Sequence, residues 1–189
     1  MSRFNLESFS TVLGAREAQG VDDEGLMPAA VMVLLYQKEG EYCVLLNKRS
    51  QQVEHHKGEM SFPGGARDPE DNDFVATALR ETEEEMGISR EDVRILGRLD
   101  DIVTRSNFGV KVYVGTIPYP YSFTPSEIEI AEVVEAPLAV LLDKANLRFE
   151  TKLVDDRPIT TCSYAYGNHL VFGATAKILQ QFLTIVEEV

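Results

Sequence analysis

The sequence predicts an α/β fold in which a mixed β-sheet lies between helices. Residues 29–36 and 42–48 are apolar, β-branched segments separated by a short polar turn, which indicates a β-hairpin. Residues 72–86 and 174–188 carry apolar side chains at helical spacing. Strands that alternate with helices in this order predict a sheet covered by helices on both faces.

The N-terminal half begins with a short helix, expected over residues 4–18, and a polar loop over residues 19–26. The hairpin follows, and then the helix of residues 72–86, for which Asn72 and Asp73 are both good N-cap residues. Val75, Ala78, Leu79, Thr82 and Met86 form the apolar stripe of this helix, and Glu81, Glu84 and Glu85 fall on an adjacent stripe, clear of that face.

The C-terminal half is expected to add strands, two short connections and a closing helix. Pro137 suits the first position of a short helix, because its missing N–H would have no partner there. The expected elements are strands over 93–102, 110–117 and 129–135, a short helix over 137–144, a hairpin from 149–154 and 160–166, and a helix over 174–188.

Composition fits one intracellular domain spanning residues 1–189. The chain is long enough for a substantial core, and it has no repeat or obvious linker. A net charge of −13 argues against nucleic-acid or anionic-membrane partners, which need a basic surface. The longest apolar run is too short to span a bilayer, the first 17 residues lack a signal-peptide core, and there are only two cysteines. We therefore expect a cytoplasmic protein.

The end of the helix of residues 72–86 is unusually acidic. Residues 80–87 contain four glutamates within five positions, directly before Gly87. Acids at a helix C-terminus are disfavoured by a few tenths to about 1 kcal/mol each, and Glu81 and Glu85, at i and i+4, repel each other. A solvated acidic face is one interpretation. A site for a hard divalent cation, which takes carboxylates and leaves positions for phosphates, is the other.

The segment upstream favours the cation. Residues 61–65 read Ser-Phe-Pro-Gly-Gly, and the two glycines permit backbone angles and close approaches that a side chain would block. Such a turn can direct a carbonyl oxygen at a metal held by the helix that follows.

Together, this turn and the Arg-Glu-x-x-Glu-Glu-x-Gly helix resemble the Nudix box, G-x5-E-x7-R-E-U-x-E-E-x-G-U. Residues 80, 81, 84, 85 and 87 match in register. Aligned on Gly65, the pattern puts Asp71 at its first glutamate and needs one extra residue before Arg80. Thr82 takes a position that is usually apolar.

Flanking segments resemble the coenzyme A pyrophosphatase subgroup of this superfamily. Residues 45–65 follow the signature L-L-T-x-R-S-x3-R-x3-G-x3-F-P-G-G, except that Asn47 replaces its threonine and Glu54 its second arginine. Residues 172–176 look like the subgroup's tail motif. The resemblance spans about residues 28–182 and implies a Nudix-type α/β/α sandwich. It is also compatible with a homodimer.

The resemblance implies roles for the acidic helix. Glu81, Glu84 and Glu85, with the Gly64 carbonyl, would bind Mg²⁺ or Mn²⁺. Arg80 would orient one of these glutamates through a bidentate contact; the alternative is an ordinary i,i+4 pair with Glu84. Asp71 or Asp73 would take the supporting part of the box's first glutamate; the alternative for either is a cap of the helix.

The remaining candidates serve the attacking water and the substrate. Glu84 within the box, or Glu129 in a segment that resembles the family's E-V-x-E-V, would be the base; the alternative for Glu129 is a solvent-facing position on an alternating strand. Arg49, at its signature position, would bind the anionic substrate or form a structural ion pair. Lys48 and Arg67 are further substrate-binding candidates.

The sequence thus predicts a metal-dependent pyrophosphohydrolase. By resemblance, coenzyme A or a derivative would be cleaved to 4′-phosphopantetheine and adenosine 3′,5′-bisphosphate. Glu54 replaces a base that suits coenzyme A phosphates, which keeps ADP-ribose and NADH open as substrates. A catalytically silent nucleotide-binding domain is the alternative from another class, and the complete metal helix argues against it.

Overall fold

The computed structural model describes residues 4–54, 56–154 and 156–189. Its centre is a mixed sheet in which β1 (Met27–Lys38) and β7 (Phe108–Thr116) run parallel, while the other ladders of this sheet are antiparallel. The neighbours run in the order β3 (Met60–Ser61), β2 (Glu41–Arg49), β1, β7 and β5 (Arg94–Arg98), with β4 (Gly64–Ala66) on β1, β6 (Ile102–Val103) on β7 and β8 (Ile130–Pro137) on β2.

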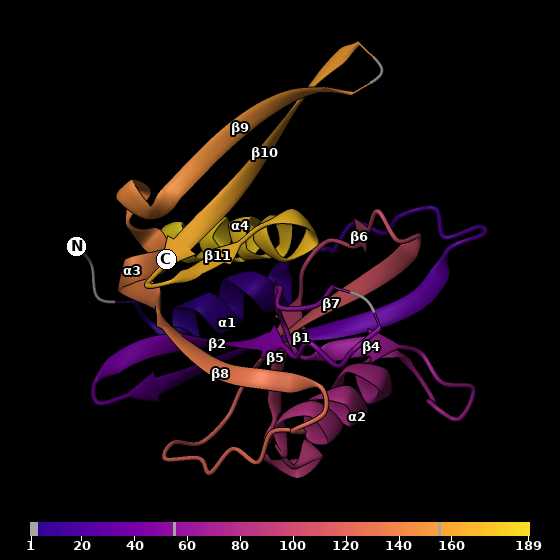
Figure 1. The fold of residues 1–189 in the computed structure, drawn as a ribbon. Coiled ribbons are helices and arrows are strands. Elements are labelled where there is room, and N and C mark those ends of the chain that lie inside the picture. The colour runs from indigo at the N-terminus through magenta and orange to yellow at the C-terminus, as the bar shows by residue number, and fades with distance from the viewer. Residues whose placement is uncertain (1–3, 55, 155) are drawn as a thin grey trace.

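Helices cover both faces of this sheet, which confirms the predicted fold class. In Figure 1, α1 (Leu6–Ala15) and α4 (Gly173–Glu187) lie on one side and α2 (Phe74–Met86) on the other. Successive strand residues point to opposite faces. Val44 and Leu46 of β2 accordingly join the buried cluster with α1 and α4, whereas Leu45 joins the cluster with α2.

One expected strand is interrupted. The segment 93–102 forms β5 only to Arg98 and pairs again at β6, because Asp100 and Asp101 leave the ladder to hold the N-terminal loop. The Gln19 N–H donates to Asp100 Oδ1 at 2.7 Å, and the Val21 N–H donates to Asp101 Oδ2 at 3.2 Å. Residues 90–92 form the short helix η1 (Arg90–Asp92) beforehand.

The C-terminal part follows the prediction with small shifts in boundaries. Pro137 caps α3 (Leu138–Leu142) rather than opening it, and η2 (Lys144–Asn146) follows. A second sheet contains β9 (Leu147–Val154), β10 (Arg157–Tyr166) and β11 (His169–Val171).

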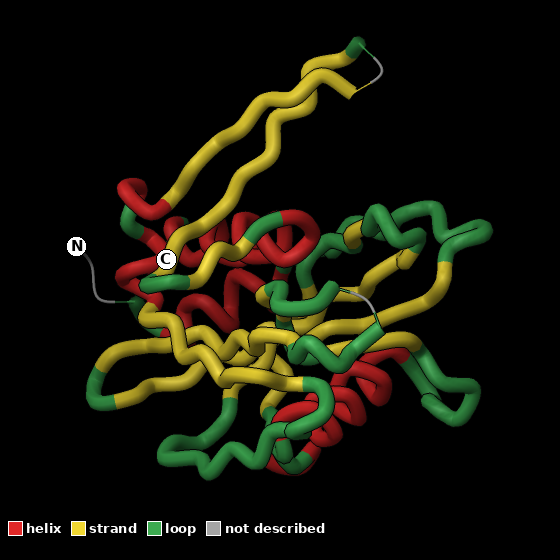
Figure 2. Tube along the Cα trace, viewed as in Figure 1, coloured by secondary structure: helices red, strands yellow, loops and turns green. Residues whose placement is uncertain are grey.

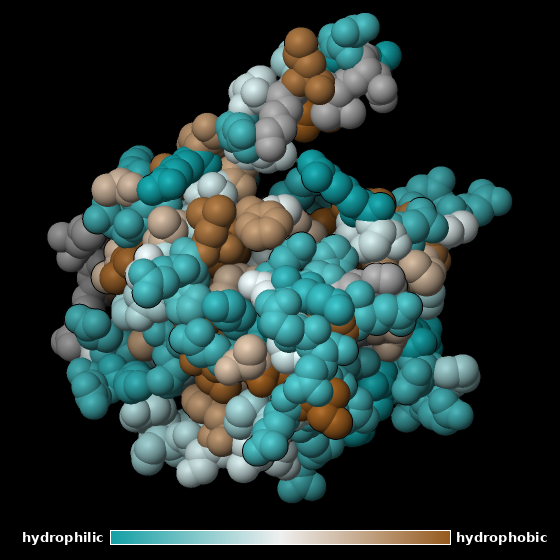
Figure 3. Space-filling view, viewed as in Figure 1, coloured by the Kyte–Doolittle hydropathy of each residue, from teal (hydrophilic) through white to brown (hydrophobic). Residues whose placement is uncertain are grey.

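The β9–β10 hairpin projects away from the rest of the molecule (Figures 1 and 2). Phe149 and Leu153 are 63% and 73% exposed, and apolar atoms show among hydrophilic ones on this hairpin in Figure 3. The hairpin was predicted, but its projection was not. In the part of the chain that the structure describes, no helix combines the length and apolarity needed to cross a membrane.

Candidate metal-binding and catalytic site

The turn between β3 and β4 needs both of its glycines. Gly64 has φ +152°, and a Cβ added there would lie 2.4 Å from the Ala30 carbonyl oxygen. A Cβ added to Gly65 would lie 2.5 Å from Oε1 of Glu81. The absence of both side chains therefore lets the backbone of this turn lie directly against β1 on one side and against a carboxylate of α2 on the other.

Helix α2 has the boundaries that the sequence predicts. Asp73 is the N-cap, and its side chain accepts a hydrogen bond from the Ala76 N–H at 2.7 Å. Gly87 ends the helix in the left-handed region with φ 67°. Asp71 and Asp73 therefore have different roles: Asp73 caps the helix, whereas Asp71 contacts Arg80.

The three glutamates of α2 lie in different environments. The side chain of Glu84 is 57% exposed, that of Glu81 is 16% exposed and that of Glu85 only 2%. The prediction that all three lie clear of the core face is wrong for Glu85. It projects between the helix and the sheet because β2 and the β3–β4 turn pack over this part of α2.

Glu85 is held by three neighbours. Its Oε2 accepts a hydrogen bond from Asn47 Nδ2 at 3.0 Å and one from the Gly64 N–H at 3.2 Å. Its Oε1 lies 3.5 Å from a guanidinium nitrogen of Arg49. Burial raises the pKa of Glu85 to about 7, although the Gly64 hydrogen bond and the Arg49 charge favour the ionised form.

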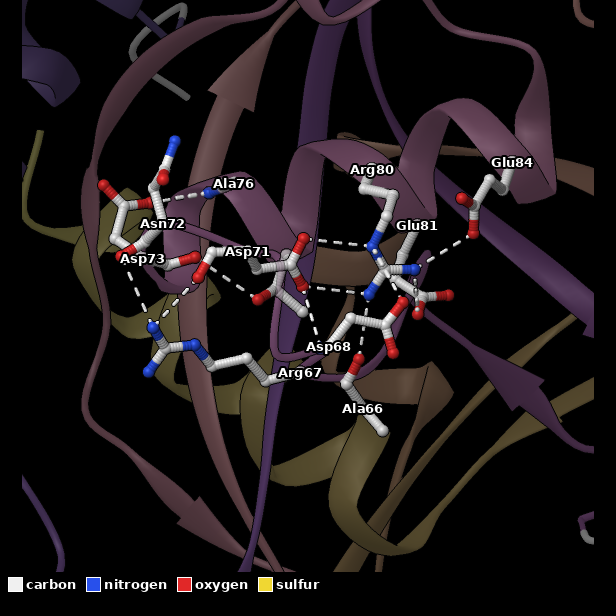
Figure 4. Close-up of polar contacts among 11 residues, drawn as sticks. Ala66, Arg67, Asp68, Asp71, Asn72, Asp73, Ala76, Arg80, Glu81 and Glu84 are labelled. Atoms are coloured by element: carbon white, nitrogen blue, oxygen red, sulfur yellow. Dashed lines mark hydrogen bonds and ion pairs between the residues drawn. The ribbon is translucent and has the colours of Figure 1, made fainter.

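Arg80 connects the loop before α2 with the glutamates (Figure 4). Its Nε and Nη2 donate to the two oxygens of Asp71 at 3.1 and 3.0 Å, and its Nη1 donates to Glu81 at 2.8 Å and to Glu84 at 3.0 Å. Nη2 also donates to the Ala66 carbonyl at 3.0 Å. The predicted bidentate contact exists, but it goes to Asp71 rather than to a glutamate of the helix.

The pKa values in this cluster depart from their ordinary values in opposite directions: that of Asp71 is lowered, and those of Glu81 and Glu85 are raised. Hydrogen bonds from Arg80 hold the pKa of Asp71 well below its ordinary value. Burial raises the pKa of Glu81, and the hydrogen bond and charge of Arg80 oppose that rise. Glu85 is therefore a buried acid and Glu81 a partly buried one, and the ionised forms of both would be stabilised by more positive charge.

The donor chemistry fits a hard divalent cation. Carboxylate oxygens of Glu81 and Glu85 come from one side of α2, beside a turn without side chains, and such oxygens are what Mg²⁺ and Mn²⁺ prefer. Within residues 4–54, 56–154 and 156–189, however, no three His, Cys, Asp or Glu side chains converge as a metal would require. Glu84 and Glu81 share the Arg80 Nη1 donor, and Glu84 accepts from that nitrogen at 3.0 Å.

Glu129 is brought to this site from far along the chain. It lies in the turn before β8, not on the strand as predicted. The Ser126 N–H donates to the Glu85 carbonyl at 2.9 Å and the Glu129 N–H donates to the Ser126 carbonyl at 3.1 Å, so this turn is attached to the end of α2. The Ser50 N–H donates to the Glu129 carbonyl at 2.7 Å, which ties this turn to the end of β2.

The predicted basic residues are distributed unevenly. Arg49 lies beside Glu85, and its Nε is buried without a hydrogen-bond partner among the described residues. Lys48 follows the alternation of β2 onto the opposite face of the sheet, away from α2. Arg67 donates to the carbonyls of Asp71 and Asn72 at 3.0 and 3.3 Å, so it holds the loop before α2.

Two residues of the site were not singled out from the sequence. Asn47 is fully buried on the α2 side of β2 and contacts Glu85, and Ser61 donates a hydrogen bond to Asn47. The signal that could have pointed to them is an asparagine directly after the apolar run of residues 42–46, since an amide that is buried there needs partners.

Comparison with known proteins agrees with the observed fold and with the match of helix α2 to the Nudix box. The family model described as NUDIX domain matches residues 26–152. A Nudix hydrolase called NudL from Photorhabdus laumondii is 33% identical to this chain, and the match covers 76% of this chain and 77% of the relative. A NudL from Yersinia pestis is also 33% identical, and its match covers 74% of this chain and 70% of the relative.

Solved structures show the same fold at lower identity. A MutT/nudix family protein from Enterococcus faecalis has a TM-score of 0.57 and 20% identity, covering 97% of this chain and 70% of its own. A C. elegans Ap4A hydrolase has a TM-score of 0.52 and 24% identity, and the match covers 59% of this chain and 80% of the hydrolase.

Proposed function

The chain belongs to the Nudix hydrolase family, and within that family we propose that it is a divalent-metal-dependent pyrophosphohydrolase of coenzyme A or its derivatives. The products would be 4′-phosphopantetheine and adenosine 3′,5′-bisphosphate. The coarser activity, hydrolysis of a nucleoside diphosphate derivative, belongs to the family. The substrate, the metal and the residue roles are our proposal.

One observation carries the proposal. Glu81 and Glu85, which match the Nudix box in register, lie partly and fully buried beside the glycine turn, and burial raises the pKa of both. Two acids kept in such a place destabilise the protein unless a cation compensates them. Bound Mg²⁺ or Mn²⁺ would neutralise the diphosphate and acidify a coordinated water.

The residues around these acids have distinct tasks in the proposed reaction. Glu81, Glu84 and Glu85 bind the cation, with the Gly64 carbonyl as a further ligand. Arg80 fixes Glu81 against the loop before α2 through its simultaneous contact with Asp71. It holds the ligand in position and does not contact the substrate.

The attacking water needs a proton acceptor. Glu129 is our first choice, because its turn is hydrogen-bonded to the Glu85 carbonyl through Ser126 and comes from a different element. Glu84 is the second choice, since its only described polar partner is Arg80 at 3.0 Å and its side chain is largely exposed. Substituting each residue by glutamine and following the rate against pH distinguishes them.

The anionic substrate would contact Arg49 first. Its guanidinium lies within 3.5 Å of Glu85, so a phosphate bound at the metal would be within its reach. Arg67 lies at the far end of the same face, 4.8 Å over the Phe74 ring, and is a second candidate. Lys48 would act only on a part of the substrate that extends around the sheet edge.

Glu54 supports a second candidate substrate class. It is exposed in the loop between β2 and β3, at the position where the coenzyme A signature has an arginine. An acid repels the 3′-phosphate that distinguishes coenzyme A from ADP-ribose and NADH. Glu54→Arg should therefore raise the preference for coenzyme A if this loop borders the substrate.

A product assay tests the proposal. Purified protein is incubated with Mg²⁺ or Mn²⁺ and with coenzyme A, ADP-ribose or NADH, and the products are identified by mass. Faster cleavage of coenzyme A supports the subgroup, whereas the reverse ranking shifts the assignment to the other diphosphates. Glu83→Gln is the matched control, because Glu83 neighbours the ligands but pairs with Arg90. No turnover of any substrate together with no metal binding would indicate the silent domain.

A further inference from the structure

Asn47 is a buried polar residue in an apolar strand. Its exposed fraction is 0%, and it lies between Leu46 and Lys48 near the end of β2. Its side chain faces α2, where Nδ2 donates a hydrogen bond to Glu85 Oε2 at 3.0 Å. The two residues are 38 positions apart in the chain, so this contact exists only in the folded protein.

Glu85 determines which way the Asn47 amide points, and Ser61 holds the amide in that position. Ser61 of β3 is the cross-strand neighbour of Asn47, and its hydroxyl donates to Asn47 Oδ1. Facing neighbours in a strand pair have side chains on the same face. If the amide were reversed, its oxygen would face the Glu85 carboxylate, and two acceptors would repel. The ionised Glu85 carboxylate, which can only accept, therefore selects the orientation with Nδ2 toward it. The Ser61 hydroxyl stabilises that orientation by donating to Oδ1.

The two oxygens of Glu85 are consequently not equivalent. Oε2 accepts two hydrogen bonds, one from Asn47 and one from the Gly64 N–H at 3.2 Å. Among the described residues, Oε1 has only the longer contact of 3.5 Å with Arg49. Fixing one oxygen of a carboxylate at two points restricts the rotation of the whole group, so the direction of Oε1 is also fixed.

We propose that Asn47, held by Ser61, is a positioning residue that immobilises Glu85 Oε2 and thereby directs Oε1 toward the divalent cation. This inference rests on the proposed function, because it takes Glu85 as a ligand of the cation. Asn47 itself does not contact the cation or the substrate. Partners of this kind that orient a ligand typically contribute 10- to 100-fold in metal affinity or activity.

Mn²⁺ binding to the intact protein tests the assignment without turnover. The free Mn²⁺ signal in electron paramagnetic resonance gives Kd for the wild-type protein and for Asn47→Leu, Asn47→Thr and Ser61→Ala. Asn47→Leu removes the donor at similar size and should weaken binding about 10- to 100-fold. Ser61→Ala frees the amide to rotate and should weaken binding in the same direction, by less.

Asn47→Thr is the conservative replacement. Its hydroxyl can donate to Glu85 and accept from Ser61, so Kd should return to within about threefold of the wild-type value. Tyr36→Phe is the matched control for loss of a buried hydrogen bond. Tyr36 is 1% exposed on the same side of the sheet and donates to Glu135 at 2.6 Å, away from the acids of α2. It should leave Kd unchanged.

Each outcome decides the inference. A folded Asn47→Leu variant with the wild-type Kd overturns it, and so does an equal loss in Tyr36→Phe. If Asn47→Leu does not fold, an unchanged Kd in Ser61→Ala overturns it. Undetectable Mn²⁺ binding by the wild-type protein also overturns it. If Asn47→Leu weakens Mn²⁺ binding, the inference is supported. If the wild-type protein then binds Mn²⁺ but cleaves no diphosphate, the inference still stands and the proposed function is refuted.

Discussion

Replacing Glu85 by glutamine should make the protein more stable at alkaline pH when no metal is present. The glutamate is 2% exposed, and burial raises its pKa from 4.5 to about 7. The folded state therefore binds this proton more tightly than the unfolded state does. Below pH 4.5 the acid is protonated in both states and its burial carries little penalty. The penalty grows as pH rises to about 7 and is then constant.

The size of the effect follows from the two pKa values. At ~1.4 kcal/mol per pKa unit, the full penalty is about 3 kcal/mol. Between pH 5 and pH 8 the free energy of unfolding of the wild-type protein should fall, relative to Glu85→Gln, by about 2.5 kcal/mol. Using the change between two pH values removes constant effects of the substitution, such as a weaker contact with Arg49.

Urea unfolding followed by circular dichroism, with a chelator at each pH, measures this difference. Glu84→Gln is the matched control, because Glu84 is 57% exposed and should change the free energy of unfolding by less than ~0.5 kcal/mol at either pH. Mn²⁺ at a hundred times its Kd should stabilise the wild-type protein by ~2.7 kcal/mol at pH 8 and Glu85→Gln by less.

Parallel stability curves for the wild-type protein and Glu85→Gln would refute the reasoning. The buried acid would then carry no penalty in the folded state, and the main argument for a compensating cation would be lost.

Three further predictions concern the same site. Gly65→Ala places a methyl group 2.5 Å from the Glu81 carboxylate and should lower kcat at least ~100-fold, measured as product release with saturating Mn²⁺. Arg80→Lys loses the fork that contacts three carboxylates and should lower both Mn²⁺ affinity and kcat, measured together by titration and turnover. Glu129→Gln should lower kcat ~100-fold or more and leave Mn²⁺ affinity nearly unchanged, whereas Glu84→Gln should weaken both.

Each of these predictions has its own check. Gly14→Ala is the control for Gly65, since the nearest atom to its added methyl is 4.0 Å away, and it should keep full activity. Asp71→Asn should reproduce much of the Arg80→Lys defect, and a fully active Asp71→Asn would argue against Arg80 as a positioning residue. Equal losses of Mn²⁺ affinity in Glu129→Gln and Glu84→Gln would remove Glu129 from the role of base.

The sequence determined the fold class and most element positions. Hydrophobic periodicity located α2 and the β1–β2 hairpin, because these patterns depend on neighbours a few residues apart. It did not anticipate the break between Arg98 and Ile102, where two aspartates leave the strand to hold a loop more than 75 residues earlier in the chain.

For the site, the sequence by itself determined the acidic helix, its glycine C-cap and the glycine turn, since each is a local pattern. Only the tertiary structure decided that Glu85 is buried, that Arg80 pairs with Asp71 and that Asn47 faces the acid. Helical spacing gives the direction of a side chain from its own axis. What packs over that side chain comes from strands far away in the sequence, and local periodicity carries no record of it.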